Sequence, residues 1–575
     1  MAQGGTFPTI DYTGIGGGYA RLGREFNTVY NIYSGPNTTG TYYSSIQPAS
    51  VSVPHTGEWY WEVCVMNFYV AGNGCMDIAR ATEHSGSSNT SYRYGFVTKQ
   101  DREYFYDATY KGQWTGGGTF GSGSILGWYV NDGVVKLYHN NTLVVTWTEE
   151  FIEGYDYHPC GLIDQYYNQN NGQTHNFGQD SSFNNLKTSG SSNATDSNGY
   201  GDFYYTPPGN ALALCSANLL TQTIVDHKEG EDNRADRYVK PLVYTGTGSA
   251  GNNITYGFKP DLVFIKDRAG IGGGYYGHAW DTSRGTDKLL YYSGPNAEVT
   301  YTDYLDWTST GIVTDTSWGG INQAGQEYCT IGWRANGGTT SSNTDGTITS
   351  TVQKSDGFSI VTYTGNGSGG ATVGHGLNKK PTFILAKNRS SSIGWVTYHK
   401  YQDNHAGNGH NGYLHLNSSQ QYSAYSAIWN GTAPTTSVIT LGTASNINTN
   451  ANNFVLYVWA DIPGLQKFGH FAGTGQTAAD GVRVYTDFQP SVIWIKRVDG
   501  AGAWAWYDTA RHPFNDITKH IELDDYFAEQ SGSNRIYILG NGFKVHTNNS
   551  EFNGDNNKYI YCAWAEQPQR YSLGR

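Results

Sequence analysis

The sequence predicts an all-β protein of several domains, and three observations carry that prediction. Charged residues make up 15% of the 575-residue chain, against a usual share of about 25%. Its 75 glycines and 46 tyrosines exceed average usage, and Gly, Asn, Ser and Thr separate short runs of Val, Ile, Tyr and Trp, as turns separate strands. The length also exceeds what one hydrophobic core serves, so we expect about three to five domains.

The stretch TGEWYWEV predicts the first well-defined strand. With a period of two, Trp59 and Trp61 fall on one face, together with the valines that follow, whereas Tyr60, Glu62 and Cys64 fall on the other. We therefore expect a half-buried strand whose tryptophans anchor the core of a β-sandwich.

Further segments follow this strand in a recognisable order. They are YRYGFV (92–97), the hairpin-like ILGWYVNDGVVKLYHNNTLV (125–144), YHPCGLI (157–163) and THNFGQDSSF (174–183). In this order they resemble the SPRY (B30.2-like) β-sandwich family, whose members are binding or scaffolding modules that bind through loops at one end. The following GYGDFYYTPPGNALALCSANL (199–219) is similar to a segment of bacteriophage virion proteins.

The C-terminal part contains three copies of one pattern. YTGTGSAG leads to KPDLVFIKDR, YTGNGSGG leads to KPTFILAKNR, and FAGTGQ leads to QPSVIWIKRVD. Each copy closes on an apolar run with a matching tryptophan, namely Trp333, Trp459 and Trp564. We predict that each copy is a domain with its own core and that these tryptophans are structural. The copies resemble an all-β domain found in tandem in tail-fibre-like proteins of marine bacteriophages.

These observations predict six parts of the chain. They are an N-terminal segment and candidate virion anchor (1–49), a SPRY-like sandwich (50–217), a linker (218–238) that contains the charged run DHKEGEDNRADR, and three β-sandwich-like repeats (239–355, 356–463 and 464–575). Repeats 1, 2 and 3 below are these last three ranges.

Two aromatic segments of the SPRY-like part are the predicted binding loops. The first, 102–124, carries Tyr104, Tyr106, Tyr110 and Trp114, and the second, 164–173, carries Tyr166 and Tyr167. Rings with polar neighbours on loops can stack on sugars or anchor into a protein partner. The alternative is that these rings pack on their own sandwich.

Several patterns that could indicate chemistry have a structural explanation instead. Two repeats match G-x-G-x-x-G at 246–251 and 365–370, but a short polar segment and a strand follow, so we interpret both as turns. The element D-T-x-R (281–284 and 508–511) is missing from repeat 2, which argues against a shared catalytic role. Four carboxylates are candidates for glycan cleavage, but we assign all of them to strand edges or turns: Glu58, Glu62, Asp164 and Asp180.

The remaining features limit partners and cofactors. The net charge of -12, without a Lys/Arg cluster, disfavours nucleic acid. The six cysteines lack metal-ligand spacing and are predicted to be small buried side chains. DSNGYGD and NGDNN could supply oxygen ligands to calcium but lack the spacing of a calcium loop, so we assign no metal site and no cofactor. We also expect neither a signal peptide nor membrane insertion.

These features argue against an enzyme, and the resemblances given above imply a virion surface protein of a bacteriophage, assembled in the host cytoplasm. The preferred interpretation is a tail fibre or adhesin that binds a host surface glycan or protein receptor and contacts other virion structural proteins. We expect a homo-oligomer, with a trimer as the first hypothesis, because fibres are symmetric and multivalency strengthens weak sites. The alternatives are a capsid- or tail-decorating protein and, in a different class, a glycan-degrading tailspike.

Overall fold

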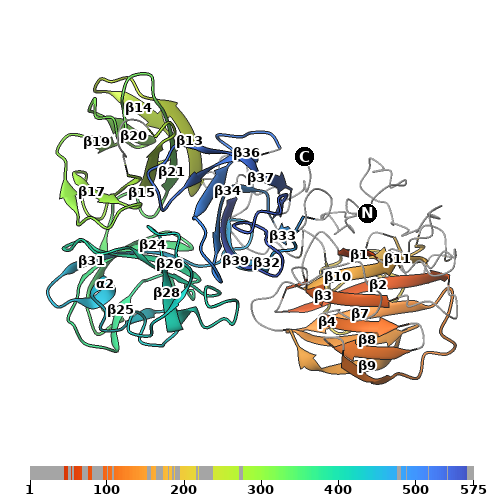
Figure 1. Ribbon diagram of the computed structural model, residues 1–575. Coiled ribbons are helices and arrows are strands. Elements are labelled where there is room, and N and C mark those ends of the chain that lie inside the picture. Colours follow the sequence, from red (N-terminus) through yellow and green to blue (C-terminus); the bar gives the residue numbers. More distant parts are fainter. Residues whose placement is uncertain are drawn as a thin grey trace. The chain divides into compact units, whose positions relative to one another are not determined.

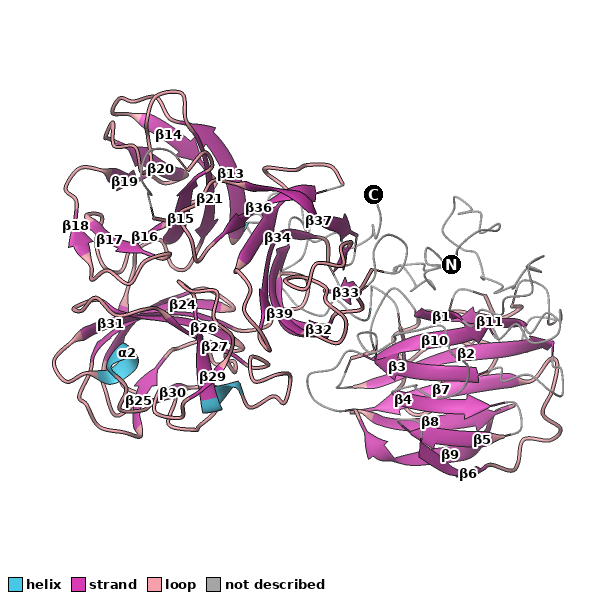
Figure 2. Ribbon diagram, in the orientation of Figure 1, coloured by secondary structure: helices cyan, strands magenta, loops and turns pink. Residues whose placement is uncertain are grey.

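The protein divides into two compact units, each described separately here (Figure 1). The computed structural model describes residues 237–565 except 271–275, 476–480, 487, 516 and 541. Before residue 237 it describes 45–48, 53–54, 57–67, 75–80, 95–99, 102–106, 109–151, 157–163, 172–178, 180–183, 187, 194–214 and 218. The predicted anchor up to residue 44 and almost all of the predicted linker lie outside the described residues. Across the described chain nearly all regular structure is strand, which confirms the predicted all-β class (Figure 2).

The first unit is a sandwich of two mainly antiparallel sheets. One sheet has the order β1 (Ser45–Pro48), β10 (Tyr157–Ile163), β3 (Cys75–Arg80), β4 (Gly95–Lys99), β5 (Glu103–Tyr106), β6 (Thr109–Gln113). The other has the order β11 (Gly172–Asn176), β2 (Glu58–Asn67), β7 (Ile125–Asn131), β8 (Val134–His139), β9 (Thr142–Glu150), with β12 (Leu212–Ala213) parallel to β2.

A stack of tryptophans fills the space between these sheets. Trp61 lies 6.4 Å from Trp128, which lies 5.6 Å from Trp147, and all three are fully buried. Phe96 of the opposite sheet packs edge-on against Trp147. Each ring removes a large apolar area from water, so the predicted sandwich core anchored by β2 is confirmed.

The expectation that β2 is buried on one face only is wrong. Tyr60, Glu62 and Cys64 are as buried as the tryptophans of the opposite face. The reason is that residues 194–214 cover this second face, where Phe203 packs edge-on against Tyr60 at 5.4 Å. A period of two gives the two faces of a strand, but it does not reveal that a segment distant in sequence covers the second one.

The second unit contains three sheets of the same design. Repeat 1 has the order β13 (Val239–Thr245), β21 (Glu327–Trp333), β15 (Leu262–Asp267), β16 (His278–Asp281), β17 (Lys288–Tyr291), β18 (Val299–Thr300). Repeat 2 has β24 (Phe358–Thr364), β31 (Asn453–Trp459), β26 (Phe383–Asn388), β27 (Val396–His399), β28 (Gly412–His415), β29 (Ser423–Ala424). Repeat 3 has β32 (Gln466–Ala472), β39 (Lys558–Ala565), β34 (Pro490–Arg497), β35 (Ala505–Asp508), β36 (Ile517–Glu522), β37 (Gln530–Leu539).

Smaller elements complete the repeats. Repeat 1 adds a sheet of β14 (Asn252–Thr255), β20 (Gly311–Thr314) and β19 (Leu305–Trp307), and repeat 2 adds β25 (Ala371–Gly374) with β30 (Val438–Leu441). β38 (Gly542–Val545) pairs with β37, and β33 (Arg483–Tyr485) precedes β34 along the chain. The short η3 (Gly409–Asn411) and α2 (Ser445–Asn448) belong to repeat 2. β22 (Ser341–Asn343) and β23 (Ser350–Lys354) also belong to the repeat 2 sheet, although both precede residue 356, where we predict that repeat 2 begins. The domain boundaries stay predictions.

The three matching tryptophans meet one another. Ring centroids lie 5.8 Å apart for Trp333 and Trp459, 5.7 Å for Trp333 and Trp564, and 6.1 Å for Trp459 and Trp564. All three are buried, as predicted, and the largest core cluster draws residues from every repeat. The repeats therefore form a pseudo-threefold ring around a shared core, which the expectation of one core in each copy did not include. Repeats 1 and 2 each keep a smaller core of their own as well.

Candidate functional site

The predicted binding residues of the first unit are placed mainly on strands. Tyr104 and Tyr106 lie on β5 and pack against the sandwich core. Trp114 is buried, donates its indole N–H to Thr98 Oγ1 at 3.0 Å, and is a core residue. Tyr110 on β6 is 54% exposed. Thus, of these four rings, Tyr110 alone presents most of its surface to solvent.

Tyr166 and Tyr167 of the second predicted loop lie outside the described residues, which include only the end of that loop, on β11. Asp164, one of the four candidate carboxylates, lies outside them too. The binding role of these residues stays a prediction.

Glu62 is the most unusual acid of the first unit. Its carboxylate is fully buried and accepts hydrogen bonds from the backbone N–H groups of Tyr204 (2.9 Å) and Tyr205 (2.8 Å), from Asn176 Nδ2 (3.2 Å) and from the Tyr60 hydroxyl (3.3 Å). Burial raises the pKa of Glu62 to about 7, against the hydrogen bonds, which lower it. The assignment of Glu62 to a strand edge is wrong, because this carboxylate fixes the covering segment to β2.

Glu58, the first residue of β2, binds partners that are distant in sequence, whereas Asp180 lies in a turn, as predicted. Glu58 accepts from the Tyr129 hydroxyl at 2.8 Å and from Asn210 N at 3.0 Å. Asp180 accepts from the backbone and hydroxyl of Ser182 at 2.8 Å and 2.7 Å, which is an Asx turn.

The glycine-rich patterns of the repeats are turns held by buried asparagines, as predicted. Asn322 accepts from Thr247 N at 2.9 Å, and Asn448 accepts from Asn366 N at 2.9 Å. Asn553 makes the same bond to Thr474 N at 2.8 Å in repeat 3. The strands β14 and β25, rather than helices, begin directly after the glycines of repeats 1 and 2. These turns therefore lack the helix N-terminus that a phosphate site of this type requires.

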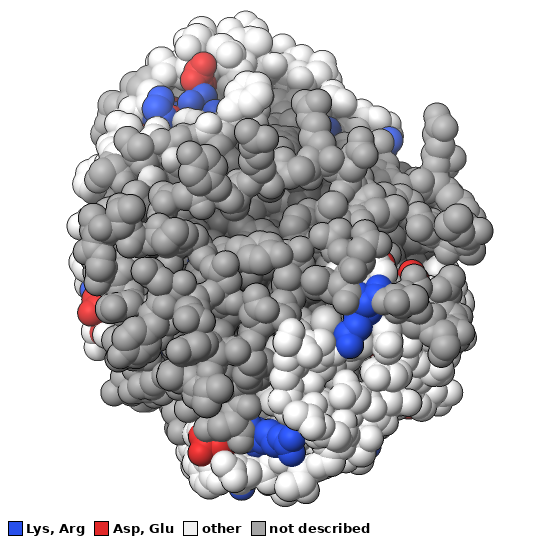
Figure 3. Space-filling view, turned by 90° about the vertical axis from the view of Figure 1, so that its right-hand side faces the viewer, with Lys and Arg blue, Asp and Glu red and all other residues white. Residues whose placement is uncertain are grey.

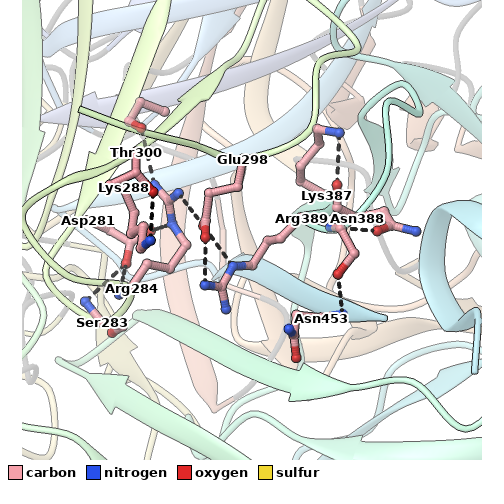
Figure 4. Close-up of polar contacts among 12 residues, drawn as sticks. Asp281, Ser283, Arg284, Lys288, Glu298, Thr300, Lys387, Asn388, Arg389 and Asn453 are labelled. Atoms are coloured by element: carbon pink, nitrogen blue, oxygen red, sulfur yellow. Dashed lines mark hydrogen bonds and ion pairs between the residues drawn. The ribbon is translucent and has the colours of Figure 1, made fainter. Parts of the chain in front are cut away.

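The D-T-x-R element builds an ionic contact between repeats 1 and 2 (Figure 4). Arg284 forms a buried ion pair with Asp281 and donates to Glu298 Oε2 at 3.0 Å. Arg389 of repeat 2 binds the same Glu298 with two bonds, of 2.8 and 2.9 Å. The Tyr457 hydroxyl of repeat 2 donates to Asp281 at 2.6 Å. Burial alone would raise the pKa of Glu298, but Arg389 and Arg284 lower it below its usual value.

Repeats 3 and 1 are joined by the same arrangement, in which a glutamate binds one arginine from each repeat. Arg511 pairs with Asp508 at 2.6 Å and with Glu529 at 2.9 Å. Arg268 of repeat 1 binds Glu529 at 3.0 Å. The element is therefore structural in both copies that carry it.

The contact between repeats 2 and 3 has the same backbone arrangement, but with apolar side chains in place of the charged ones. Glu298 N and Glu529 N donate to the backbone carbonyls of Arg389 and Arg268, and Tyr422 N donates likewise to Val498 O at 3.0 Å. Tyr422 thus stands in the place of the glutamate and Val498 in that of the arginine, and both pack on the shared core. This substitution explains why repeat 2 can lack D-T-x-R.

A buried lysine in each repeat reaches across to another repeat. The Nζ atom of Lys266 donates to Asp525 O at 2.5 Å, that of Lys387 to Pro295 O at 3.0 Å, and that of Lys496 to Ser419 O at 3.2 Å. Burial lowers the pKa of Lys266 and Lys496 to about 8 and that of Lys387 to about 7. Sequence reasoning missed these contacts, although a lysine recurs at the end of each apolar run in the quoted patterns.

Repeat 1 also carries a half-buried group of near-parallel aromatic rings. The rings of Tyr301 and Tyr304 lie 4.7 Å apart at an interplanar angle of 14°. Trp318 lies 5.3 Å from Tyr301 and 5.5 Å from Tyr304, at 25° to each. We call these three side chains the aromatic platform. All three pack on the core of repeat 1 while keeping part of their surface exposed.

Short segments after β18 and β20 hold the aromatic platform in place. Tyr301 N donates to Asp287 O at 2.9 Å, and Asp315 N donates to Tyr304 O at 3.1 Å, so the two segments are tied together. The Tyr301 hydroxyl lies 3.2 Å from that of Tyr291. A side chain at Gly320 would lie within 2.8 Å of the Trp318 ring, so this glycine permits the close approach of the indole to the backbone.

Carboxylates flank the aromatic platform. Asp315 accepts from Gly251 N at 2.9 Å, and Asp306 lies on β19, directly after the platform tyrosines. Burial raises the pKa of Asp306, and the neighbouring Asp315 and Asp303 raise it further. This rim is therefore acidic.

The described residues contain no group of three or more His, Cys, Asp or Glu side chains that could hold a metal ion. No described helix is long and apolar enough to cross a membrane. On the face shown in Figure 3, the described Lys and Arg side chains lie apart or beside acidic ones and do not gather into a basic patch.

Known proteins resemble this chain as follows. A family model described as "Domain of unknown function (DUF7483)" matches residues 234–568. No curated protein matches the chain. The SPRY domain of human HERC1 is 12% identical, over 24% of this chain and 82% of that one, at a TM-score of 0.20. The metal-free carbohydrate recognition domain of Emp46p is 11% identical, over 26% of this chain and 84% of that one, at a TM-score of 0.19.

A NanB sialidase mutant from Streptococcus pneumoniae is 9% identical, over 86% of this chain and 74% of that one, at a TM-score of 0.15. We draw no ligand or activity from these structural likenesses.

Proposed function

The chain belongs to the DUF7483 family, and we propose that it is a non-enzymatic virion surface protein of a bacteriophage, a tail fibre or adhesin that binds the host cell surface. The aromatic platform of repeat 1 is the observation that carries this proposal. Its rings keep part of their surface accessible, and aromatic rings beside polar groups are typical of surfaces that bind sugars or protein partners. The resemblances of the SPRY-like part and of the repeats to virion proteins supply the biological setting.

The repeats themselves show that the fold does not demand a tryptophan at the position of Trp318. Ile321 N and Asn322 N both donate to Trp318 O, and the corresponding pairs of N–H groups in repeats 2 and 3 donate to Ala444 O and Asn549 O. The same backbone position therefore holds tryptophan, alanine and asparagine in the three repeats. A large, partly exposed ring that two equivalent positions do without favours a binding role over a purely structural one.

An adsorption assay tests this proposal. Host cells are incubated with saturating purified protein and then with phage, and the adsorbed particles are counted. We expect the protein to bind the cells and to reduce phage adsorption, because it occupies the same receptors. Undiminished adsorption, with antibody labelling on the capsid or along the tail, would replace the adhesin with a decorating protein.

A second measurement addresses the enzymatic alternative. Purified protein is incubated with host surface polysaccharide, and the release of reducing ends is followed over time. We expect no release, because the proposal assigns binding without bond cleavage. Sustained release would replace the adhesin with a glycan-degrading tailspike.

A further inference from the structure

We propose that acid opens the second unit at the contact between repeats 2 and 3, through protonation of a cluster of three histidines, while the other two contacts between repeats stay closed. The histidine cluster consists of His399 and His405 of repeat 2 and His470 of repeat 3. This inference goes beyond the proposed function and does not depend on it.

The histidine cluster lies where the two repeats touch. The rings of His405 and His470 lie 4.2 Å apart. His399 Nε2 lies 3.2 Å from Tyr561 O, and His405 Nε2 lies 2.9 Å from Tyr559 O, and both carbonyls belong to β39 of repeat 3. His399 and His470 are buried, and His405 is partly buried. Each of the three imidazoles therefore contacts the opposite repeat.

Hydrogen bonding holds His399 in its neutral form. Tyr401 N donates to His399 Nδ1 at 3.2 Å, so the proton of the neutral ring is on Nε2, which donates to Tyr561 O. A second proton would go onto Nδ1, where it would face the N–H of Tyr401 and break this bond. Burial also lowers the pKa of His399 to about 3. Because the Nε2 side of the ring faces repeat 3, water reaches this histidine when the two repeats separate.

The charged groups around the cluster also oppose protonation. Burial, His470 and Lys558 lower the pKa of His405. Repeat 2 places Lys400 over the Tyr401 ring, 5.4 Å from its centre. The same turn carries Asp403 and His410, and the Asp403 carboxylate accepts from the backbone N–H of residue 408 at 2.8 Å. Each proton that the cluster takes up adds a positive charge beside the other imidazoles and Lys558, and separating the repeats relieves this repulsion.

The other two contacts keep their charges in acid. His399 ends β27, and the strands at the same place in repeats 1 and 3 end with Asp281 and Asp508, each paired with an arginine. Burial would raise the pKa of Glu298 and Glu529, but the arginines beside them lower it below its usual value. These ion pairs therefore persist at pH 5, where an exposed imidazole is mostly protonated.

Four backbone amides report on the three contacts separately. Tyr422 N and Gly502 N donate to carbonyls across the contact between repeats 2 and 3, at 3.0 and 2.9 Å. Glu298 N and Glu529 N donate across the other two contacts. Hydrogen exchange of the full chain at pH 7 and pH 5 follows all four amides in one experiment, by mass spectrometry with peptide fragmentation. The protection factor corrects each rate for the intrinsic effect of pH on exchange.

We expect acid to affect these amides differently. From pH 7 to pH 5 the protection factors of Tyr422 and Gly502 should fall by about 25-fold or more, the factor for one histidine that takes up a proton only in the open state. Those of Glu298 and Glu529 should stay nearly constant. The variant H399Q/H405Q keeps a side-chain N–H donor at both positions but does not titrate, so it should lose the acid response.

H375Q is the matched control. His375 is buried in repeat 2, where Leu377 N donates to its Nδ1 and its Nε2 binds Thr435 O, which is the bonding pattern of His399 within one repeat. H375Q should therefore keep the acid response at Tyr422 and Gly502. Thermal melting at pH 7 checks that the variants fold. If H399Q/H405Q does not fold, H405Q alone, at the partly exposed position, should show a reduced acid response.

Three results would overturn the proposal. All four amides could lose protection together, which would indicate unfolding of the whole unit. The amides of Tyr422 and Gly502 could stay protected at pH 5. Finally, the glutamine variants could respond to acid as the unchanged protein does.

Discussion

Single residues in this protein show how burial changes ionisation. His278 lies fully buried on β16, with its ring 4.7 Å from that of Trp318, and burial lowers its pKa to about 3. The folded protein therefore keeps this imidazole neutral at pH values where the unfolded chain protonates it. Between about pH 6.5 and 3 the unfolded state binds more protons, so stability falls as the pH falls.

This sign gives a testable pH dependence. As the pH falls from 7 to 5, the buried, neutral His278 should lower the unfolding free energy of the second unit by about 2 kcal/mol. The variant H278V adopts the residue found at Val396, the equivalent position of repeat 2, and should lose that part of the dependence. Urea unfolding at both pH values measures it. Identical pH dependence in the two proteins would show that His278 titrates normally in the fold.

At the scale of the elements, the three contacts between repeats share one backbone arrangement but use different side chains. Two contacts hold a partly buried glutamate between arginines of two repeats, and the third replaces these groups with Tyr422 and Val498. Removing one partner of a buried ion pair leaves the other charge without compensation, whereas replacing both groups by apolar ones avoids that cost.

The variant E298A should therefore destabilise the second unit by about 3 kcal/mol or more, because Arg284 and Arg389 lose their shared carboxylate. The double variant E298Y/R389V copies the contact between repeats 2 and 3 and should recover most of this loss. Chemical denaturation of the three proteins decides the matter. A double variant less stable than E298A would mean that the apolar contact cannot be transferred between repeats.

The sequence predicted those elements that depend on neighbouring residues, and it missed those that depend on residues far away along the chain. Alternation located β2, the apolar runs that close each repeat located the tryptophan-bearing strands, and turn chemistry identified the glycine-rich turns, because these signals are local. The cover over Glu62 and the lysine that crosses from one repeat to another depend on partners more than 75 residues away in sequence. Trp318 was detectable in principle, by comparing the repeats position by position.

At the scale of the whole molecule, the tryptophan cluster makes the second unit one cooperative body. Trp333, Trp459 and Trp564 come from different repeats and lie within 6.1 Å of one another. Three repeats that share a core gain stability from one another, so unfolding one exposes the rings of the other two.

A double-mutant cycle measures this coupling. W333F and W459F together should deviate from additivity by about 1 kcal/mol, because the two rings are in contact. The pair W333F and W429F is the control, since Trp429 belongs to the core of repeat 2 alone. Additive losses in both pairs, measured by denaturant unfolding, would argue that the repeats fold independently.

The aromatic platform on a single repeat has a consequence for how such a ring can evolve. In a trimer of identical chains every mutation appears three times, so a new surface must be tolerable at three places at once. Here the three copies lie within one polypeptide, so a single mutation alters one repeat and leaves the other two unchanged. Trp318 could therefore arise while Ala444 and Asn549 kept their own identities, and one chain offers one platform. Because the repeats lie within one chain, the core residues can stay alike in all three copies while the surface residues differ from copy to copy.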